Sequence, residues 1–170
     1  MTDTEATTPA ELTAAIAGAL HNEHFPTGER AALKRMAPEG RAPLAYHRFI
    51  MSKVPERWQG GRYESAWRTL IAAIALQPAH PHDANRPVGE ALARIDFSED
   101  RLERLLAADD SMLNTLVLRA ARRLAAHHAR ANWNDLARLL FAYGDEARER
   151  INQRIARDYY RVPNRDSENG

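Results

Sequence analysis

Helical periodicity is the feature that most constrains how this chain can fold, and it is clearest between residues 111 and 161. Apolar residues at the start of this stretch share one stripe of a helical projection; they are Leu113, Leu116, Val117, Ala120 and Leu124. Segments with the same period recur along the chain, and no segment shows the strict alternation of a half-buried strand. The sequence therefore predicts an all-α protein, a compact helical bundle of about eight or nine helices with no β-sheet.

Capping residues mark where several of these helices begin. The sequence Thr-Pro-Ala-Glu at 8–11 combines an N-cap threonine, a proline at the first helical position and a reciprocating glutamate. It predicts a helix that runs to about Leu20. Ser98 and Asn132 are typical N-caps as well, and each precedes a segment of helical period.

The length of 170 residues suits one domain with one substantial core. We expect a disordered lead over residues 1–7, a single all-helical domain over 8–162 and a polar tail over 163–170. The proline-containing stretch 77–87 is the longest predicted loop, and two sub-bundles would join there.

Sequence features of enzymes are absent from the chain. It contains no cysteine, which excludes disulfides, thiolate metal sites and cysteine nucleophiles. It also contains no nucleophile elbow, phosphate loop, zinc-protease helix or clear carboxylate dyad. The histidine pairs His21/His24 and His80/His82 lack the spacing and further ligands of a known metal site. We therefore expect a protein that is not an enzyme and that holds no cofactor.

Targeting and membrane signals are absent as well. No basic-then-apolar leader begins the sequence, and no apolar run is long enough to span a bilayer. The absence of cysteine fits a reducing compartment. We therefore expect a cytoplasmic protein without membrane contacts.

Charge is unevenly distributed, although the formal net charge is only +1. Residues 30–68 contain nine basic and three acidic residues, and residues 119–165 contain eleven basic and five acidic residues. Between them, residues 83–110 contain four basic and eight acidic residues. Of the 24 basic residues all but two are arginine, which reflects either a GC-rich genome or a preference for bidentate phosphate contacts. Two basic blocks separated by an acidic one can focus positive potential on part of the surface.

Arginines follow the helical period in the last third of the chain. One group falls on a wedge beside the apolar stripe and consists of Arg119, Arg122, Arg123 and Arg130. A second group recurs on one side of the last predicted helix and consists of Arg150, Arg154, Arg157 and Arg161. Guanidinium groups on a rigid support bind phosphates through forked donors, so these faces predict contacts to a nucleic-acid backbone. Pairing within the last helix, such as Glu146 with Arg150, is the alternative for the second group.

An earlier basic block adds further residues to the predicted nucleic-acid-binding set: Arg30, Lys34, Arg35 and Arg62. Tyr63 and Trp67 lie near this block and could stack on bases. The helical spacing of Trp67 with apolar residues favours a place in the core instead.

Several segments, in their order and spacing, carry a resemblance to a known family. They are 28–35 (GERAALKR), 89–92 (GEAL), 98–109 (SEDRLERLLAAD), 118–123 (LRAARR), Trp133-x-x-Leu136-x-x-x-Leu140 and 158–160 (DYY). Together they extend over most of the chain. The sequence resembles the small subunit of the type I-E CRISPR Cascade surveillance complex, the CasB family.

The resemblance implies an all-helical, non-catalytic subunit, present in two copies in a complex built on a guide RNA. It implies contacts with the backbone and large subunits, a second copy of itself, the guide RNA and target DNA, especially the non-target strand. In this family, basic residues hold that displaced single-stranded DNA and stabilise the R-loop in antiviral defence. The matching basic positions are Lys34, Arg35, Arg62, Arg122 and Arg148, and the chain departs from some relatives in being acidic at Asp145 and Glu146.

Two other functional hypotheses fit the same residues. A purely structural helical adaptor would use its basic faces to bind protein or guide RNA. A helix-turn-helix reader of duplex DNA would span residues 113–143, where two predicted helices meet at a short break. The arginines lie on the first of these helices rather than on the start of the second, which argues against the duplex reader.

Overall fold

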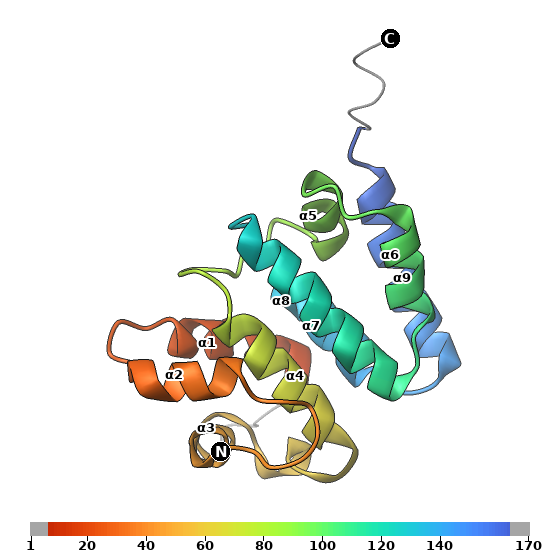
Figure 1. Cartoon of the computed structure of the whole chain (residues 1–170). Coiled ribbons are helices and arrows are strands. Elements are labelled where there is room, and N and C mark those ends of the chain that lie inside the picture. Colours follow the sequence, from red (N-terminus) through yellow and green to blue (C-terminus); the bar gives the residue numbers. More distant parts are fainter. Residues whose placement is uncertain (1–6, 164–170) are drawn as a thin grey trace, which may run out of the picture.

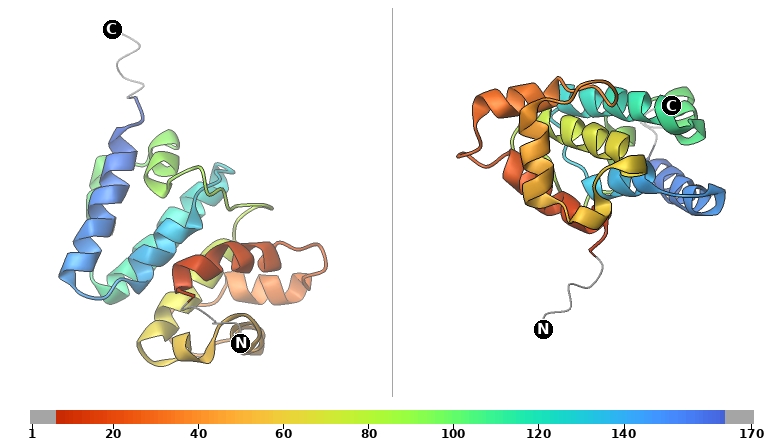
Figure 2. Two further views of the ribbon diagram at one scale, coloured as in Figure 1. Left: turned by 180° about the vertical axis from the view of Figure 1, so that it is seen from behind. Right: turned by 90° about the horizontal axis from the view of Figure 1, so that it is seen from below.

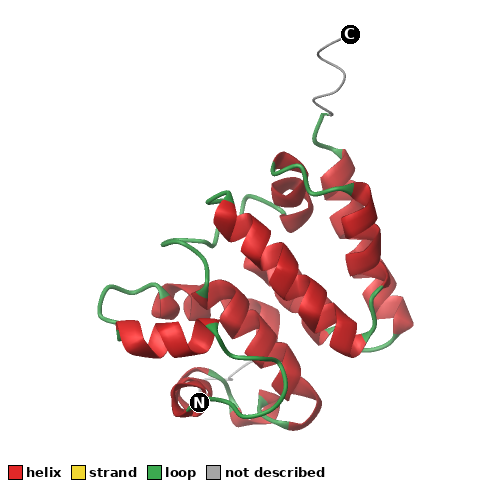
Figure 3. Cartoon of the chain, viewed as in Figure 1, coloured by secondary structure: helices red, strands yellow, loops and turns green. Residues whose placement is uncertain are grey.

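The computed structural model describes residues 7–163, and its regular structure is helical (Figure 1 and Figure 3). The described residues contain two short 3-10 helices, Glu56–Trp58 and Gly61–Tyr63, and no strand. Their nine α-helices are α1 Pro9–Leu20, α2 Thr27–Lys34, α3 Leu44–Lys53, α4 Glu64–Ala75, α5 Val88–Arg94, α6 Glu99–Ala107, α7 Asp110–Ala126, α8 Trp133–Phe141 and α9 Asp145–Tyr160. The predicted all-α class is confirmed. Of the predicted lead and tail, all but Thr7 and Pro163 lie outside the described residues.

Helix α4 lies at the centre of the molecule and is its most buried helix. Ten of its 12 residues, Ala66 to Ala75, are buried. It packs against α1, α2, α7 and α8, which surround it in the views of Figure 2. Trp67 is fully buried, and its indole N–H donates to the Trp58 carbonyl at 2.8 Å. The predicted core position of Trp67 is therefore confirmed.

The helices α1–α4 and α5–α9 occupy opposite ends of the molecule (Figure 1). They meet in the middle, where α1 packs against α8 and α4 against α7. One cluster of buried apolar side chains runs through both groups. Between residues 7 and 163, no helix combines the length and apolar character needed to cross a membrane.

The helix starts predicted from capping residues are present in the structure. The Thr8 hydroxyl accepts from the Glu11 N–H at 3.4 Å, and the Glu11 carboxylate accepts from the Thr8 N–H at 2.9 Å. Ser98 and Asn132 cap α6 and α8 through their side-chain oxygens. Each cap satisfies an N–H group that the first helical turn leaves without a partner.

The end of α7 differs from the sequence prediction. The helix stops at Ala126, and His128 takes a positive φ of 50°. Arg130 therefore lies beyond α7 and not on the wedge of arginines along it. Its guanidinium donates to the carbonyls of His80 and His82 at 3.0 and 3.2 Å, which ties the 77–87 loop to the segment that follows α7.

Helices α5 and α9 approach each other closely at Gly89. A Cβ atom at this position would lie 2.2 Å from the Ile155 carbonyl oxygen and 2.8 Å from the Tyr159 nitrogen. Only glycine lets the two backbones approach this closely. The packing places the second half of α9 against α5.

Candidate nucleic-acid interface

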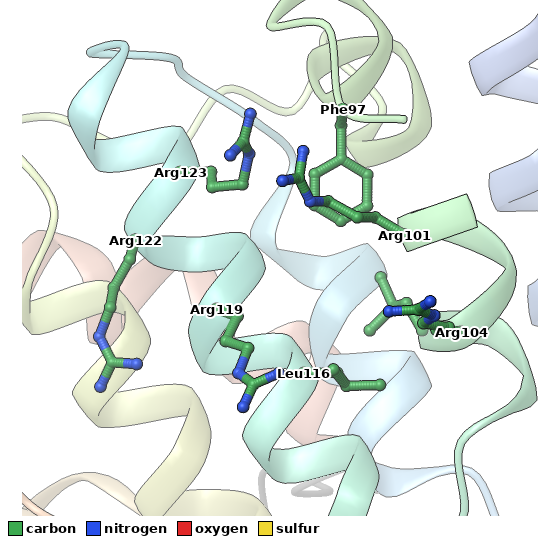
Figure 4. A pocket seen from close by; sticks show the side chains of 8 residues that line it. Phe97, Arg101, Arg104, Leu116, Arg119, Arg122 and Arg123 are labelled. Carbon is green, nitrogen blue, oxygen red and sulfur yellow. The ribbon is translucent and has the colours of Figure 1, made fainter. Parts of the chain in front are cut away.

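A basic hollow of about 350 Å³ lies between α6 and α7 (Figure 4). Its base is apolar and consists of Phe97, Leu105 and Leu116. Its walls carry five arginines, two from α6 and three from α7: Arg101, Arg104, Arg119, Arg122 and Arg123. We call this feature the arginine groove.

The periodicity of the two helices places the arginines of the groove. Arg101 and Arg104 are three residues apart on α6, whose other side buries Leu102 and Leu105. On α7 the arginines occupy positions 119, 122 and 123, and buried residues such as Val117, Ala121 and Leu124 face the core. A connection of only two residues joins α6 to α7, so the two basic faces form the walls of one hollow.

The guanidinium groups of the arginine groove are free of protein partners. Within residues 7–163, none of the five makes an ion pair or side-chain hydrogen bond. Arg123 Nε is moreover buried without a hydrogen-bond partner in this part of the chain. A buried donor without a partner costs roughly 1–3 kcal/mol. A polyanion in the groove would supply acceptors to donors that the protein leaves unsatisfied.

The basic residues predicted near the N-terminus lie outside the arginine groove. Lys34 and Arg35 are exposed at the end of α2. Arg30 is half-buried, and its guanidinium donates to the Leu20 carbonyl at 2.9 Å. Arg62 contacts the rings of Tyr63 and Tyr143. None of these four residues lines the arginine groove.

Arg148 lies inside a helix–helix junction. Its guanidinium donates to the Ala108 carbonyl at 3.0 Å and lies 3.4 Å from the carbonyls of Leu105 and Leu106. Burial lowers the pKa of Arg148 from its ordinary value. These contacts give the side chain a clear structural role, because they satisfy carbonyls that the end of α6 leaves free.

The second predicted arginine group lies on the solvent side of α9. Arg150, Arg154, Arg157 and Arg161 are exposed, and the opposite side of the helix buries Ile155. Arg150 pairs with Glu146 at 3.5 Å, as the pairing alternative expected. Arg161 pairs with Asp158, also at 3.5 Å. This surface is partly neutralised by acidic residues of its own helix.

Arg101 and Arg104 are the residues that the sequence analysis missed. They lie in the acid-rich stretch 83–110, so a count of charge along the chain does not indicate a basic surface there. Their spacing of three residues, next to the apolar period of Leu102 and Leu105, was the available signal.

A second, polar hollow of about 590 Å³ lies between α1 and the 77–87 loop and contains His21, His80 and His82. His21 Nε2 lies 2.8 Å from the Ile74 carbonyl, and His82 Nδ1 accepts from the Trp133 N–H at 3.2 Å. Burial lowers the pKa of both His21 and His82. No three His, Asp or Glu side chains of residues 7–163 are grouped as metal ligands.

Helix α8 occupies the place of a recognition helix in the helix-turn-helix interpretation. Every residue of α8 is buried or half-buried, and Trp133, Leu136 and Ala137 are fully buried. A recognition helix needs a free face that can enter the major groove. α8 offers no such face.

Comparisons with known proteins agree with the helical architecture. A family model described as CRISPR-associated protein Cse2 matches residues 29–160. A chain in the crystal structure of E. coli Cascade bound to a PAM-containing dsDNA target has the same fold, with a TM-score of 0.65. The two chains share 19% sequence identity over 88% of this chain and 97% of that chain. No curated protein sequence matches the chain significantly.

Proposed function

This chain belongs to the CRISPR-associated Cse2 family, the CasB family of small subunits of type I-E Cascade, and from this premise we propose that it holds single-stranded DNA in the arginine groove. In this proposal the protein is a non-catalytic subunit for CRISPR antiviral defence. The strand is the one displaced when the guide RNA pairs with target DNA. The observation that carries the proposal is the set of five arginines around one hollow, none of which has a side-chain partner among residues 7–163.

The chemistry of the groove suits a nucleic-acid backbone. Guanidinium groups on both walls can donate to phosphate oxygens, and the apolar side chains that line the groove can contact sugars. Such contacts carry no sequence information, which suits a subunit that must hold a strand of any sequence. The exposed arginines of α9 and the α2 residues Lys34 and Arg35 are further proposed contacts along the strand.

The proposed partners follow from family membership. They are the backbone and large subunits of Cascade, a second copy of this chain and the guide RNA, in the cytoplasm. One observation also favours the adaptor function: Leu44 and Met51 are 69% and 70% exposed on α3. Large apolar side chains on a helix surface are suited to protein contacts, and this function is compatible with DNA binding in the groove.

The proposal is tested by replacing Arg119→Ala and Arg122→Ala together. Both side chains are exposed, so the thermal midpoint should stay nearly unchanged. Affinity for single-stranded DNA of any sequence should fall, and the log–log salt slope should shrink by about 0.7 per arginine. Fluorescence anisotropy at several salt concentrations measures both quantities for the isolated chain and for the assembled complex.

A matched control replaces Arg48→Ala and Arg94→Ala, which removes the same charge from the ion pairs with Glu29 and Glu90. We expect this control to keep most of the affinity and slope. Unchanged affinity in the groove variant, or an equal loss in the control, would contradict the proposal. A preference for a duplex of the same sequence would favour the helix-turn-helix hypothesis instead.

A further inference from the structure

We propose that Arg62, Tyr63 and Tyr143 form a separate site for one unpaired nucleobase, which stacks on the exposed ring of Tyr143. The inference shares with the proposed function only its ligand class, single-stranded nucleic acid. It concerns the bases of the strand, whereas the arginine groove concerns its phosphates. We call this feature the tyrosine site.

The tyrosine site is a guanidinium held between two aromatic rings. Arg62 Cζ lies 4.8 Å from the Tyr63 ring centroid and 4.3 Å from the Tyr143 ring centroid. Arg62 Nη2 also donates to the Tyr63 hydroxyl at 2.8 Å. Two cation–π contacts and one hydrogen bond fix the Arg62 side chain, although it is exposed.

The rest of the protein anchors this arrangement. The Tyr63 ring packs edge-on against Trp58, with centroids 5.2 Å apart, and tilted against Phe141 at 6.3 Å. Tyr143 lies two residues beyond the end of α8 at Phe141, and Gly144, with a φ of 89°, turns the chain into α9. The site is therefore built on the ends of elements and loses little conformational freedom when a ligand binds.

Tyr143 leaves a large aromatic surface in contact with solvent. It is 78% exposed, the highest exposure of any large apolar or aromatic side chain between residues 7 and 163. The guanidinium covers one ring face, so the other is free for a planar ligand. Stacking of a base on an aromatic ring is tolerant of sequence, because every base has a π face.

The surroundings of the tyrosine site favour a base over a phosphate. The hollow beside it has a volume of about 280 Å³ and includes Asp110 and Asn114. The Asp110 carboxylate disfavours a phosphate by like-charge repulsion. Asn114 is buried, at 6% exposure, and its side-chain amide lines the hollow without a hydrogen bond to another described residue, so a base edge that enters the hollow can pair with it.

The tyrosine site and the arginine groove lie on opposite sides of α7. At 100° per residue, Asp110 and Asn114 lie roughly 140 to 180° around α7 from Arg119 and Arg123. A change at one site therefore leaves the other intact. The two proposals can be tested separately.

The test compares a DNA strand that carries bases with an abasic strand of equal length, which has the same phosphates. We expect the wild-type protein to bind the abasic strand about ten-fold more weakly, the loss of one good stacking contact. Tyr143→Ala should lose the same factor on the base-bearing strand and none on the abasic strand. Tyr143→Phe should keep wild-type affinity, because the ring remains.

Tyr160→Ala is the matched control, because Tyr160 is also exposed, at 62%, but makes no arginine contact within the described residues. It should bind both strands as the wild type does. Arg119→Ala combined with Arg122→Ala should lower the affinity for both strands by the same factor, so that the ten-fold ratio between the two affinities remains. If that double change has no effect while the ratio persists, the groove proposal fails and the tyrosine site stands.

Three results would overturn the tyrosine site: equal wild-type affinity for both strands, an equal effect of Tyr143→Ala on both, or the same effect from Tyr160→Ala. The last two would indicate a general surface effect or a protein-docking tyrosine. Ultraviolet crosslinking of a 5-iodouracil strand gives a second readout that tolerates weak binding; the crosslinked peptide should contain Tyr143. The same measurements with an RNA strand of equal sequence decide whether the base comes from DNA or from RNA.

Discussion

Of the glycines that the structure describes, Gly89 is the one at which an added Cβ atom would meet other atoms. A Cβ there would lie 2.2 Å from a backbone oxygen of α9, a distance that no rotation of a side chain can relieve. We expect Gly89→Ala to destabilise the protein by at least about 1–3 kcal/mol, the usual cost of overpacking, because α5 and α9 must separate. A lower thermal midpoint or a lower denaturant midpoint measures the effect.

Gly18→Ala serves as the control for this change. Gly18 lies in α1, and a Cβ there would meet no atom within 4 Å. Replacing a helical glycine by alanine with no clash stabilises a helix by about 0.5–1 kcal/mol. If both variants changed stability in the same direction, steric contact at residue 89 would not be the cause.

Arg148 shows how one side chain can complete the end of another helix. The last carbonyls of α6 have no partners within α6, and Arg148 from α9 donates to them. Arg148→Ala removes this donor from the Leu105 and Ala108 carbonyls, whereas the Leu106 carbonyl keeps its hydrogen bond from Asn152 Nδ2 at 2.9 Å. We expect a loss of about 1–3 kcal/mol of unfolding free energy. Chemical denaturation monitored by circular dichroism measures it.

Arg150→Ala is the comparison for Arg148→Ala, because it changes a neighbouring residue of the same helix that is exposed and pairs only with Glu146. An exposed pair of this kind contributes roughly 0.3–0.5 kcal/mol. Equal stability of the two variants would show that the carbonyl contacts of Arg148 contribute nothing.

Local signals predicted single helices well and helix pairs poorly. The caps at Thr8, Ser98 and Asn132 could be read from the sequence because a cap involves residues only two or three positions apart. The α7 half of the arginine groove could be predicted because one helix sets the direction of its own side chains. The α6 half could not, because no periodicity states which two helices lie side by side.

Positions set by tertiary contacts were outside the reach of the sequence. α7 ends at Ala126, and His128 just beyond it takes a left-handed conformation although it is not glycine, so no sequence signal marked the end of the helix before Arg130. Arg130 and Arg148 donate hydrogen bonds to carbonyls some 40 to 50 residues away along the chain, which the sequence does not indicate. Tyr143 was likewise not singled out, because its partner Arg62 comes from a distant element.

For the molecule as a whole, the histidine hollow joins parts that are far apart in the sequence, and this makes overall stability depend on pH. His21 bonds to the end of α4, and His82 accepts from the first residue of α8. Because burial lowers their pKa values below about 6.5, the unfolded chain takes up protons first as the pH falls. We expect the free energy of unfolding to decrease between pH 7.5 and pH 5.5.

Thermal unfolding at several pH values measures this dependence. His82→Asn keeps an acceptor for the Trp133 N–H but cannot titrate, so its stability should change less over the same range. Burial raises the pKa of Asp158, which acts in the opposite direction but at lower pH. Stability that rises on acidification, or an identical profile in His82→Asn, would refute the assignment to His82.

The buried Arg123 Nε affects the stability of the whole unliganded protein. Folding brings five like charges into one hollow and leaves one of their donors without an acceptor, so the unliganded protein is locally frustrated. A polyanion bound in the arginine groove, as proposed above, would offset this frustration only in the native state, and by thermodynamic linkage it would then raise the stability of the entire chain. Under the proposed function, the five arginines that favour binding are therefore the same five that destabilise the unliganded protein.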